Sequence, residues 1–213
     1  MKEVTLEIGG EEVILLADKA AFFPKHSTLI ISDIHLGKST HFRKAGIPLS
    51  AGAYHTDLKR MEELIKQTSP QTVVFLGDLF HSYHNVEWEL FSQWLANYRN
   101  IEFILVEGNH DVLPVDIYER AGVVVKKFHR LNTIVLSHEP LKNNSGYNIY
   151  GHIHPGIKLY GKAYQSVKIA CFHIGKNSMI MPAFGGLTGM YMMDVKADDL
   201  VYGIADLTLI KVK

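Results

Sequence analysis

The sequence is poor in cysteine and lacks long apolar runs. Cys171 is the only cysteine among 213 residues, which excludes an internal disulfide framework and fits a reducing cytoplasm. No apolar run approaches the roughly 20 residues that a membrane-spanning helix needs. The N-terminal residues Met1-Lys2-Glu3-Val4 lack the basic stretch and apolar core of a signal peptide. We therefore expect a cytoplasmic protein that makes no use of a membrane.

Net charge is also absent. Twenty-two Lys and Arg residues balance 22 Asp and Glu residues, so the bulk charge gives no sign of nucleic-acid binding. Bound divalent ions would nevertheless add about four positive charges at one place, because such ions can be the largest charges in a site. The 12 histidines make this relevant, since histidine is the commonest metal ligand.

The length and composition predict one folded unit. A chain of 213 residues with 47% hydrophobic content can bury a sizeable core, and its mixed charge argues against disorder. The sequence contains no internal repeat, no low-complexity tract and no long linker. We expect residues 1–213 to form a single domain.

Short apolar segments rich in β-branched residues predict buried strands, and apolar residues at helical spacing predict helices between them. The predicted strands are 28–31, 72–76, 102–106 and 133–136. The predicted helices are 53–68, 87–98 and a shorter one after Pro114. Alternating helices and strands, followed by a strand-rich C-terminal part, predict an α/β fold layered as a sandwich with two sheets.

Potential metal ligands follow each of these strands and a fifth strand-like segment, 147–150. In α/β sheets, ligand-binding residues collect at the carboxyl ends of strands, so we expect these side chains to converge. Glycines at 77, 108 and 151 allow tight turns beside them. The seven candidate ligands are Asp33, His35, Asp78, Asn109, His138, His152 and His154.

The spacing and chemistry of these residues predict a pair of divalent ions. In a strand, residues i and i+2 point to one face, so Asp33–His35 and His152–His154 could each direct two ligands at one place. Oxygen and imidazole ligands without thiolate suit Mn, Fe, Zn or Mg. Seven ligands exceed the needs of one ion, and two ions about 3.5–4 Å apart form the usual clamp for displacement at phosphorus. Each motif alone is weak evidence for a metal site, because such motifs often occur by chance. The prediction rests on their combination.

In this order and spacing, the motifs resemble the signature of the calcineurin-like metallophosphoesterases. The match runs from about Leu29 to His154 and includes Gly108-Asn109-His110-Asp111. The resemblance implies a four-layer αββα sandwich with two mixed β-sheets. It also implies one metal held by Asp33, His35, Asp78 and His154, and a second held by Asp78, Asn109, His138 and His152. Asp78 would bridge the two ions.

The same resemblance implies catalytic roles for His110 and Asp111. A metal-activated water or hydroxide would attack phosphorus, and His110 would contact the phosphate and protonate the leaving oxygen as general acid. Asp111 would orient His110, as a carboxylate commonly fixes an imidazole. A histidine that is not a ligand but lies beside the metals also suits general-acid catalysis near neutral pH.

Three further stretches resemble the bacterial ligase-associated DNA damage response endonucleases, a subfamily of these enzymes. The stretches are 33–48, 77–82 and 182–189. The resemblance implies a Mn-dependent phosphodiesterase or endonuclease that acts on DNA in repair. It also implies functional association with an ATP-dependent DNA ligase, a nuclease and a helicase.

Four residues are candidates for substrate binding: Lys38, His41, Arg43 and His81. The first three follow the first ligand strand directly, where a cationic cluster could bind a phosphate backbone. Lys38 and Arg43 could instead belong to a solvated loop, since charged surface residues are common. The basic run 126–130 is read first as an exposed strand edge or turn, and second as a DNA contact.

Two other functions remain open from the sequence. A small-molecule phosphoesterase, acting on cyclic nucleotides, nucleotides or a nucleotide-sugar pyrophosphate, would use the same metal centre. A non-catalytic metal-binding scaffold is disfavoured because the ligands and His110 are all present. Only 28 residues separate Asn109 from His138 and 13 separate His138 from His152, which leaves no room for a cap domain there. The cleft should therefore be open, as suits a polymeric substrate.

Overall fold

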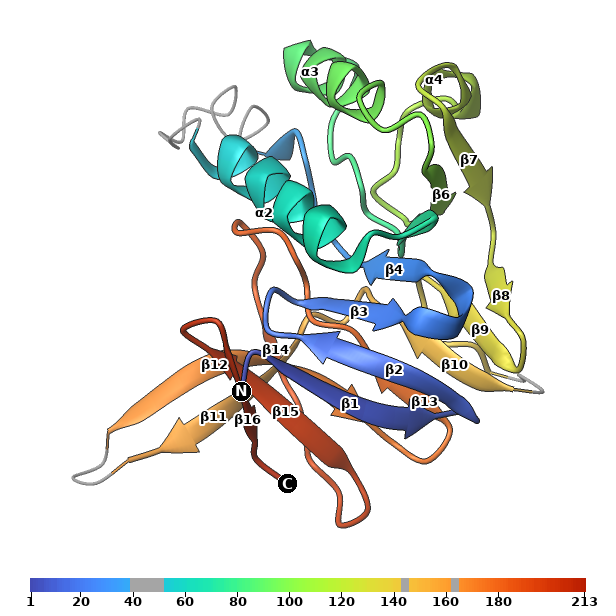
Figure 1. The fold of residues 1–213 in the computed structure, drawn as a ribbon. Coiled ribbons are helices and arrows are strands. Elements are labelled where there is room, and N and C mark those ends of the chain that lie inside the picture. The colour runs from blue at the N-terminus through green and yellow to red at the C-terminus, as the bar shows by residue number, and fades with distance from the viewer. Residues whose placement is uncertain (39–51, 143–145, 162–164) are drawn as a thin grey trace.

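Two β-sheets face each other in the computed structural model, which describes residues 1–38, 52–142, 146–161 and 165–213 (Figure 1). In the first sheet, neighbouring strands are antiparallel from β1 to β4 and parallel from β4 to β7. Its strands, in spatial as well as chain order, are β1 (Glu3–Ile8), β2 (Glu11–Leu16), β3 (Ala20–Phe23), β4 (Thr28–Ile31), β5 (Thr72–Phe75), β6 (Glu102–Val106) and β7 (Val123–Lys126).

The second sheet is built from the C-terminal part of the chain. It contains parallel pairs, β9–β10 and β10–β13, as well as antiparallel ones. Its spatial order is β14-β11-β12-β13-β10-β9-β8, and β15 and β16 extend from β12. Its strands are β8 (His129–Leu131), β9 (Ile134–Ser137), β10 (Tyr147–Tyr150), β11 (Pro155–Tyr160), β12 (Ser166–Ile174), β13 (Ser178–Ile180), β14 (Tyr191–Met192), β15 (Leu200–Ala205) and β16 (Thr208–Lys211).

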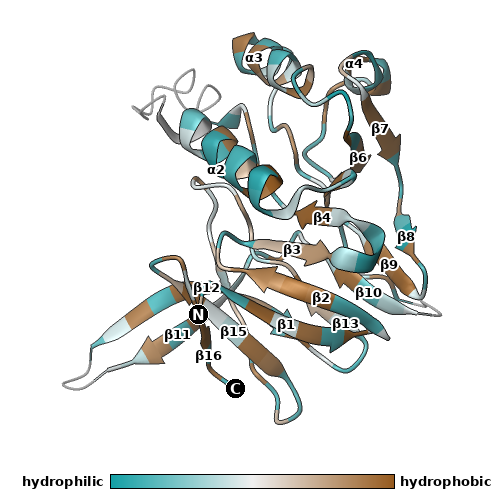
Figure 2. Ribbon diagram, viewed as in Figure 1, coloured by the Kyte–Doolittle hydropathy of each residue, from teal (hydrophilic) through white to brown (hydrophobic). Residues whose placement is uncertain are grey.

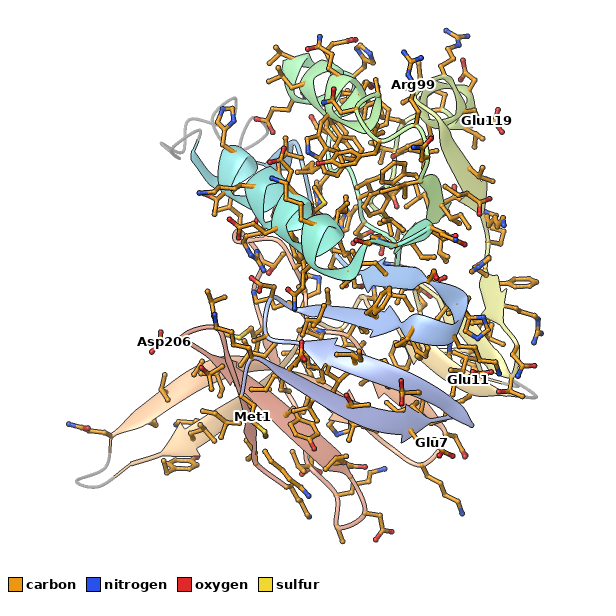
Figure 3. The ribbon with its side chains drawn as sticks, viewed as in Figure 1. Met1, Glu7, Glu11, Arg99, Glu119 and Asp206 are labelled. Atoms are coloured by element: carbon orange, nitrogen blue, oxygen red, sulfur yellow. The ribbon has the colours of Figure 1, made fainter. Side chains whose placement is uncertain are left out.

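Helices cover the outer face of the first sheet. They are α2 (Gly52–Thr68), α3 (Val86–Leu95) and α4 (Val115–Arg120), each linking successive parallel strands, while the short η1 (Pro24–His26) joins β3 to β4. Figure 3 shows side chains filling the space between these helices and the sheet. Asn85 caps α3 by accepting hydrogen bonds from the amides of Glu87 and Trp88. None of the described helices is long and apolar enough to span a membrane.

Alternation along the central strands divides the core into two layers. In β4, Leu29 and Ile31 pack toward the helices, whereas Ile30 packs against the second sheet. The same alternation continues in β5 and β6, so these strands are buried on both faces, as parallel strands between two layers must be. Figure 2 shows β2 and β4 as largely hydrophobic, while α2 mixes hydrophobic and hydrophilic residues.

The α/β fold with two mixed sheets is confirmed, as are the predicted strands and helices to within a few residues. Within the described ranges, all three α-helices lie on the first sheet. The second sheet has no such helices, and its outer face carries a small buried cluster of Ile157, Ile169, Cys171 and Val201 within the described ranges.

Candidate metal centre

The candidate ligands gather where strands of both sheets end. Asp33 and His35 follow β4, Asp78 follows β5 and Asn109 follows β6, all in the first sheet. His138 follows β9, and His152 and His154 follow β10, in the second sheet. Hydrogen bonds join these loops: the His152 amide donates to the Asp33 carboxylate (3.0 Å to Oδ2), and the Gly151 amide donates to the His138 carbonyl (3.1 Å). The structure thus brings together ligands from distant parts of the chain.

Asp33, His35 and His154 form one compact group of possible ligands. His154 Nε2 lies 3.2 Å from Asp33 Oδ1 and 3.4 Å from His35 Nε2. Two atoms bound to one ion at about 2.1 Å can be no more than about 4.2 Å apart, so this spacing suits a shared cation.

A second group of donor atoms surrounds His138 Nε2. This nitrogen lies 3.1 Å from Asn109 Oδ1, 3.2 Å from His152 Nδ1 and 3.4 Å from Asp78 Oδ1. These four donor atoms form a second group of possible ligands.

Asp78 lies between the two groups. Its Oδ1 faces His138, while its Oδ2 lies 3.7 Å from His35 Nε2, so a different oxygen faces each group. This arrangement suits a bridging carboxylate. Asp33 is also close to both groups, because it forms a second compact cluster with Asp78 and His138.

The pKa shifts of His35 and Asp33 fit metal binding, which requires neutral imidazoles and ionised carboxylates. Burial, assisted by the charge of Lys38, lowers the pKa of His35 to about 3. Burial would raise the pKa of Asp33, but hydrogen bonds from His154 and Ser32 outweigh it, and the pKa is lowered. His138 Nδ1 lies 3.1 Å from the Leu76 carbonyl and donates to it, which leaves Nε2 free to bind a cation. The donor set therefore fits a pair of divalent ions.

The backbone at five of the candidate ligands is strained, which the sequence did not reveal. Asp33, His35, Asp78, His152 and His154 all have positive φ, between 52° and 63°. The expectation that Asp33–His35 and His152–His154 project from one face of a strand is wrong, because β4 ends at Ile31 and β10 at Tyr150. A left-handed conformation costs a residue with a side chain about 1–3 kcal/mol, and such strain clusters at functional sites.

Gly151 allows the closest approach in the centre. A Cβ at this position would lie 1.9 Å from Ser32 Oγ and 2.4 Å from Asp33 Oδ2. The Ser32 hydroxyl, which we did not identify from the sequence, donates to Asp33 Oδ2 at 2.6 Å. A side chain at residue 151 must therefore displace the Asp33 carboxylate.

We expect Gly151→Ala to lower metal affinity by about 10–100-fold, because losing the support of a ligand typically costs that much. Isothermal titration of the metal-free protein with Mn²⁺ measures the change. Gly161→Ala is the matched control, since its Cβ would lie 3.8 Å from its nearest neighbour. Equal affinities in the two variants would show that the Asp33 loop tolerates displacement.

His110 and His81 lie side by side next to the first group. Their rings stack with centroids 4.0 Å apart, and the His110 ring lies 5.8 Å from that of His35. His81 Nδ1 is 3.1 Å from His35 Nδ1, so His81 can also fix the orientation of this ligand. The His110 amide donates to Asp78 Oδ1 (2.9 Å), which holds the residue beside the centre.

Asp111 is placed differently from the sequence prediction. Its carboxylate accepts hydrogen bonds from the amides of Asp78 and Gly108 (2.8 Å each), of Leu79 (2.8 Å) and of Phe80 (3.1 Å). No hydrogen bond between described residues joins it to the His110 ring. Burial raises the pKa of Asp111 to about 6, although the amides favour its charged form. Asp111 therefore fastens the loop after β5 to the loop after β6, instead of contacting His110 directly.

Replacing Asp111 with asparagine is expected to destabilise the metal-free protein by about 2–3 kcal/mol at pH 8, because an amide nitrogen would face buried N–H donors. Urea denaturation of both proteins without metal measures the difference. Unchanged stability combined with lost activity would restore the direct catalytic role that the sequence predicted.

The structure describes some of the other residues that were predicted to bind substrate. Lys38 is half-buried and close enough to interact electrostatically with His35 and Asp78. His41 and Arg43 lie outside the described residues. A cavity of about 480 Å³ borders Asn109 and His138, and Lys127 of the basic run and Glu139 line it. The centre therefore opens onto a broad polar surface.

Comparison with known proteins gives the family of the chain. The family model described as calcineurin-like phosphoesterase matches residues 26–199. The chain belongs to this family. It is therefore a metal-dependent phosphoesterase, and its relatives use divalent metal ions. No curated protein matches the sequence.

The solved structure of Pseudomonas putida nuclease MPE is similar over nearly the full length. It shares 25% sequence identity with a TM-score of 0.82, and the match covers 95% of this chain and 96% of that one. A phosphoesterase from E. coli, Yfce, matches at 16% identity and a TM-score of 0.46, over 87% of this chain and 97% of its own. A protein of unknown function from Aquifex aeolicus matches at 18% identity and 0.41, over 64% and 81%.

Proposed function

We propose that this phosphoesterase is a phosphodiesterase that uses two divalent ions, preferably Mn²⁺. We also propose that it cleaves DNA as an endonuclease. The likeness to a nuclease over almost the whole of both chains carries this proposal. The motif resemblance in 33–48, 77–82 and 182–189 supports the same substrate. A role in DNA repair, with a ligase, a nuclease and a helicase as functional associates, belongs to the proposal and rests on that resemblance alone.

The two groups of donor atoms are proposed to hold one ion each. Asp33, His35 and His154 would hold the first, Asn109, His138 and His152 the second, and Asp78 would contact both. When bound, such ions lower the pKa of a water molecule and neutralise charge that develops on phosphoryl oxygens. Fe, Zn or Mg would also suit this mixed oxygen and imidazole set.

His110 is proposed to act as the general acid. It is only partly buried, so its ring can reach a substrate phosphodiester, and its amide is held by Asp78. Protonation of the leaving oxygen by this imidazole would complete cleavage of the P–O bond. Stacking on His81 limits the freedom of the ring, and Lys38 adds a positive charge near the phosphate.

Metal removal and replacement test the proposal. The metal-free protein should be inactive, and Mn²⁺ should restore cleavage of single- or double-stranded DNA and of a generic phosphodiester more than of a phosphomonoester. Mg²⁺ and Zn²⁺, added singly, identify the preferred metal. Cleavage of small esters without action on any DNA would overturn the substrate and favour a small-molecule phosphoesterase.

A further inference from the structure

A small cavity adjoins the metal centre at His154. Its volume is about 220 Å³, and its lining includes Lys19, His154, Ala170, Gly185, Thr188 and Met190. Pockets for drug-sized ligands usually measure about 300–1,000 Å³, so this one suits a smaller group. It lies beside a metal ligand and also contains a cation.

The cation is Lys19, in the turn between β2 and β3. Its ammonium has no ion pair or hydrogen bond with any described residue. Asp57, whose charge acts on Lys19, is itself engaged by Arg60 (3.2 Å) and by the Gly186 amide (3.3 Å). Burial, reinforced by the charge of Arg60, lowers the pKa of Lys19. An ammonium that is partly desolvated and makes no direct ion pair with a described residue is suited to attract an anion.

The backbone at Lys19 has a left-handed conformation, with φ of 65°. Glycine or asparagine is the usual residue at such a position in a three-residue hairpin turn, because a side chain is strained there. The conformation of the turn therefore does not favour a lysine at this position. Its side chain lining the cavity offers a reason for its presence.

Arg60 fixes this turn in relation to the metal centre. Its guanidinium donates to the carbonyls of Asp18 and Phe184 (2.9 Å each) and lies 3.9 Å above the Phe184 ring. The amides of Phe184 and Gly185 in turn donate to the carbonyls of Ser32 (2.8 Å) and Asp33 (3.2 Å). Lys19, the loop after β13 and the Asp33 ligand loop thus form one connected unit.

We propose that this cavity binds the backbone phosphate of the nucleotide next to the scissile one, and that Lys19 is the cation that contacts it. The inference rests on the proposed action on DNA, and it assigns Lys19 a role in distinguishing a polynucleotide from a small ester. A small diester carries no second phosphate, so it cannot use this contact. Lysine binds phosphate as a point charge, and a phosphate contact carries no information about the base.

Oligonucleotides with one uncharged methylphosphonate linkage test the proposal without altering the protein. With the neutral linkage on one side of the cut, cleavage by the wild-type protein should slow about ten-fold, the effect of losing one charge-assisted hydrogen bond. In Lys19→Gln, kcat/KM for the all-phosphate oligonucleotide should fall about ten-fold relative to that for a small diester. The neutral linkage should then have no further effect.

Two variants control for folding and for bulk charge. Lys19→Arg keeps the positive charge and should cleave DNA nearly as well as the wild type. Lys25→Gln removes an exposed lysine at the other end of β3, paired with Glu11, and should leave both activities unchanged. If the wild type cuts DNA but tolerates the neutral linkage on both sides, or if Lys19→Gln matches the wild type, the role of Lys19 is overturned. If the wild type cuts no DNA, both the inference and the proposed substrate fail.

Discussion

Replacing His110 with asparagine is expected to lower kcat for DNA by about 10²–10⁴-fold, the usual contribution of general-acid catalysis. Metal content should not change, because none of the donor-atom distances within the two groups involves the His110 ring. The His110 amide, which donates to Asp78, is retained in the variant. Steady-state kinetics and metal analysis of the same preparation measure the two quantities.

Substrates with different leaving groups show whether His110 acts as the acid. A nitrophenyl diester releases a stable phenolate that needs little protonation, so the loss of His110 should affect its hydrolysis less than that of DNA. His84→Asn is the matched control, since His84 is half-exposed and paired with Glu89 (2.9 Å). Loss of metal from the His110 variant would show that this residue supports the centre, and would refute its assignment as the acid.

Asp78→Asn is expected to have the other large effect, with activity lowered by more than about 100-fold and at least one metal site emptied. The substitution removes the negative charge from a residue whose two oxygens face different groups, at 3.4 Å from His138 and 3.7 Å from His35. Loss of an outer-shell partner alone costs about 10–100-fold, and a ligand should cost more. Metal analysis after dialysis, together with kcat, measures the result.

Asp116→Asn serves as the control for Asp78→Asn, because Asp116 is exposed and pairs with Arg120 on α4. Retention of two equivalents of metal by the Asp78 variant would contradict the bridging role. Asp33 would then be the better candidate, because it is close to both groups.

The candidate ligands could be identified from the sequence because each of them follows closely after a predicted strand. Buried strands such as β4 and β5 are recognisable as short apolar runs, and the polar residue that follows each of them stands out. The prediction that the ligand-bearing strand ends converge followed from this pattern and from the rule for α/β sheets. The structure brings all seven residues together, while their binding of metal stays a prediction.

Contacts between residues far apart in the chain could not be predicted. The family resemblance assigned Asp111 to His110, since a carboxylate commonly orients an imidazole, but its amide partners at residues 78–80 belong to another loop. Lys19 was not recognised at all, since its proximity to His154 depends on how the two sheets pack. The left-handed backbone at Asp33 and His35 could not be predicted, because Asp and His favour this conformation only weakly and tertiary structure imposes it here.

One local signal was overlooked. Gly9 and Gly10, both with positive φ, connect β1 to β2 in a two-residue hairpin. A glycine pair between alternating apolar residues is a strong hairpin signal, so the N-terminal strands could have been predicted from the sequence.

Anomalous diffraction from crystals grown with Mn²⁺ would locate the bound ions and so test the dinuclear centre. A dinuclear centre gives two peaks about 3.5–4 Å apart. One should lie among Asp33, His35 and His154, the other among Asn109, His138 and His152, with Asp78 between them. A single peak, or peaks away from these residues, would contradict the dinuclear centre on which the proposed function depends.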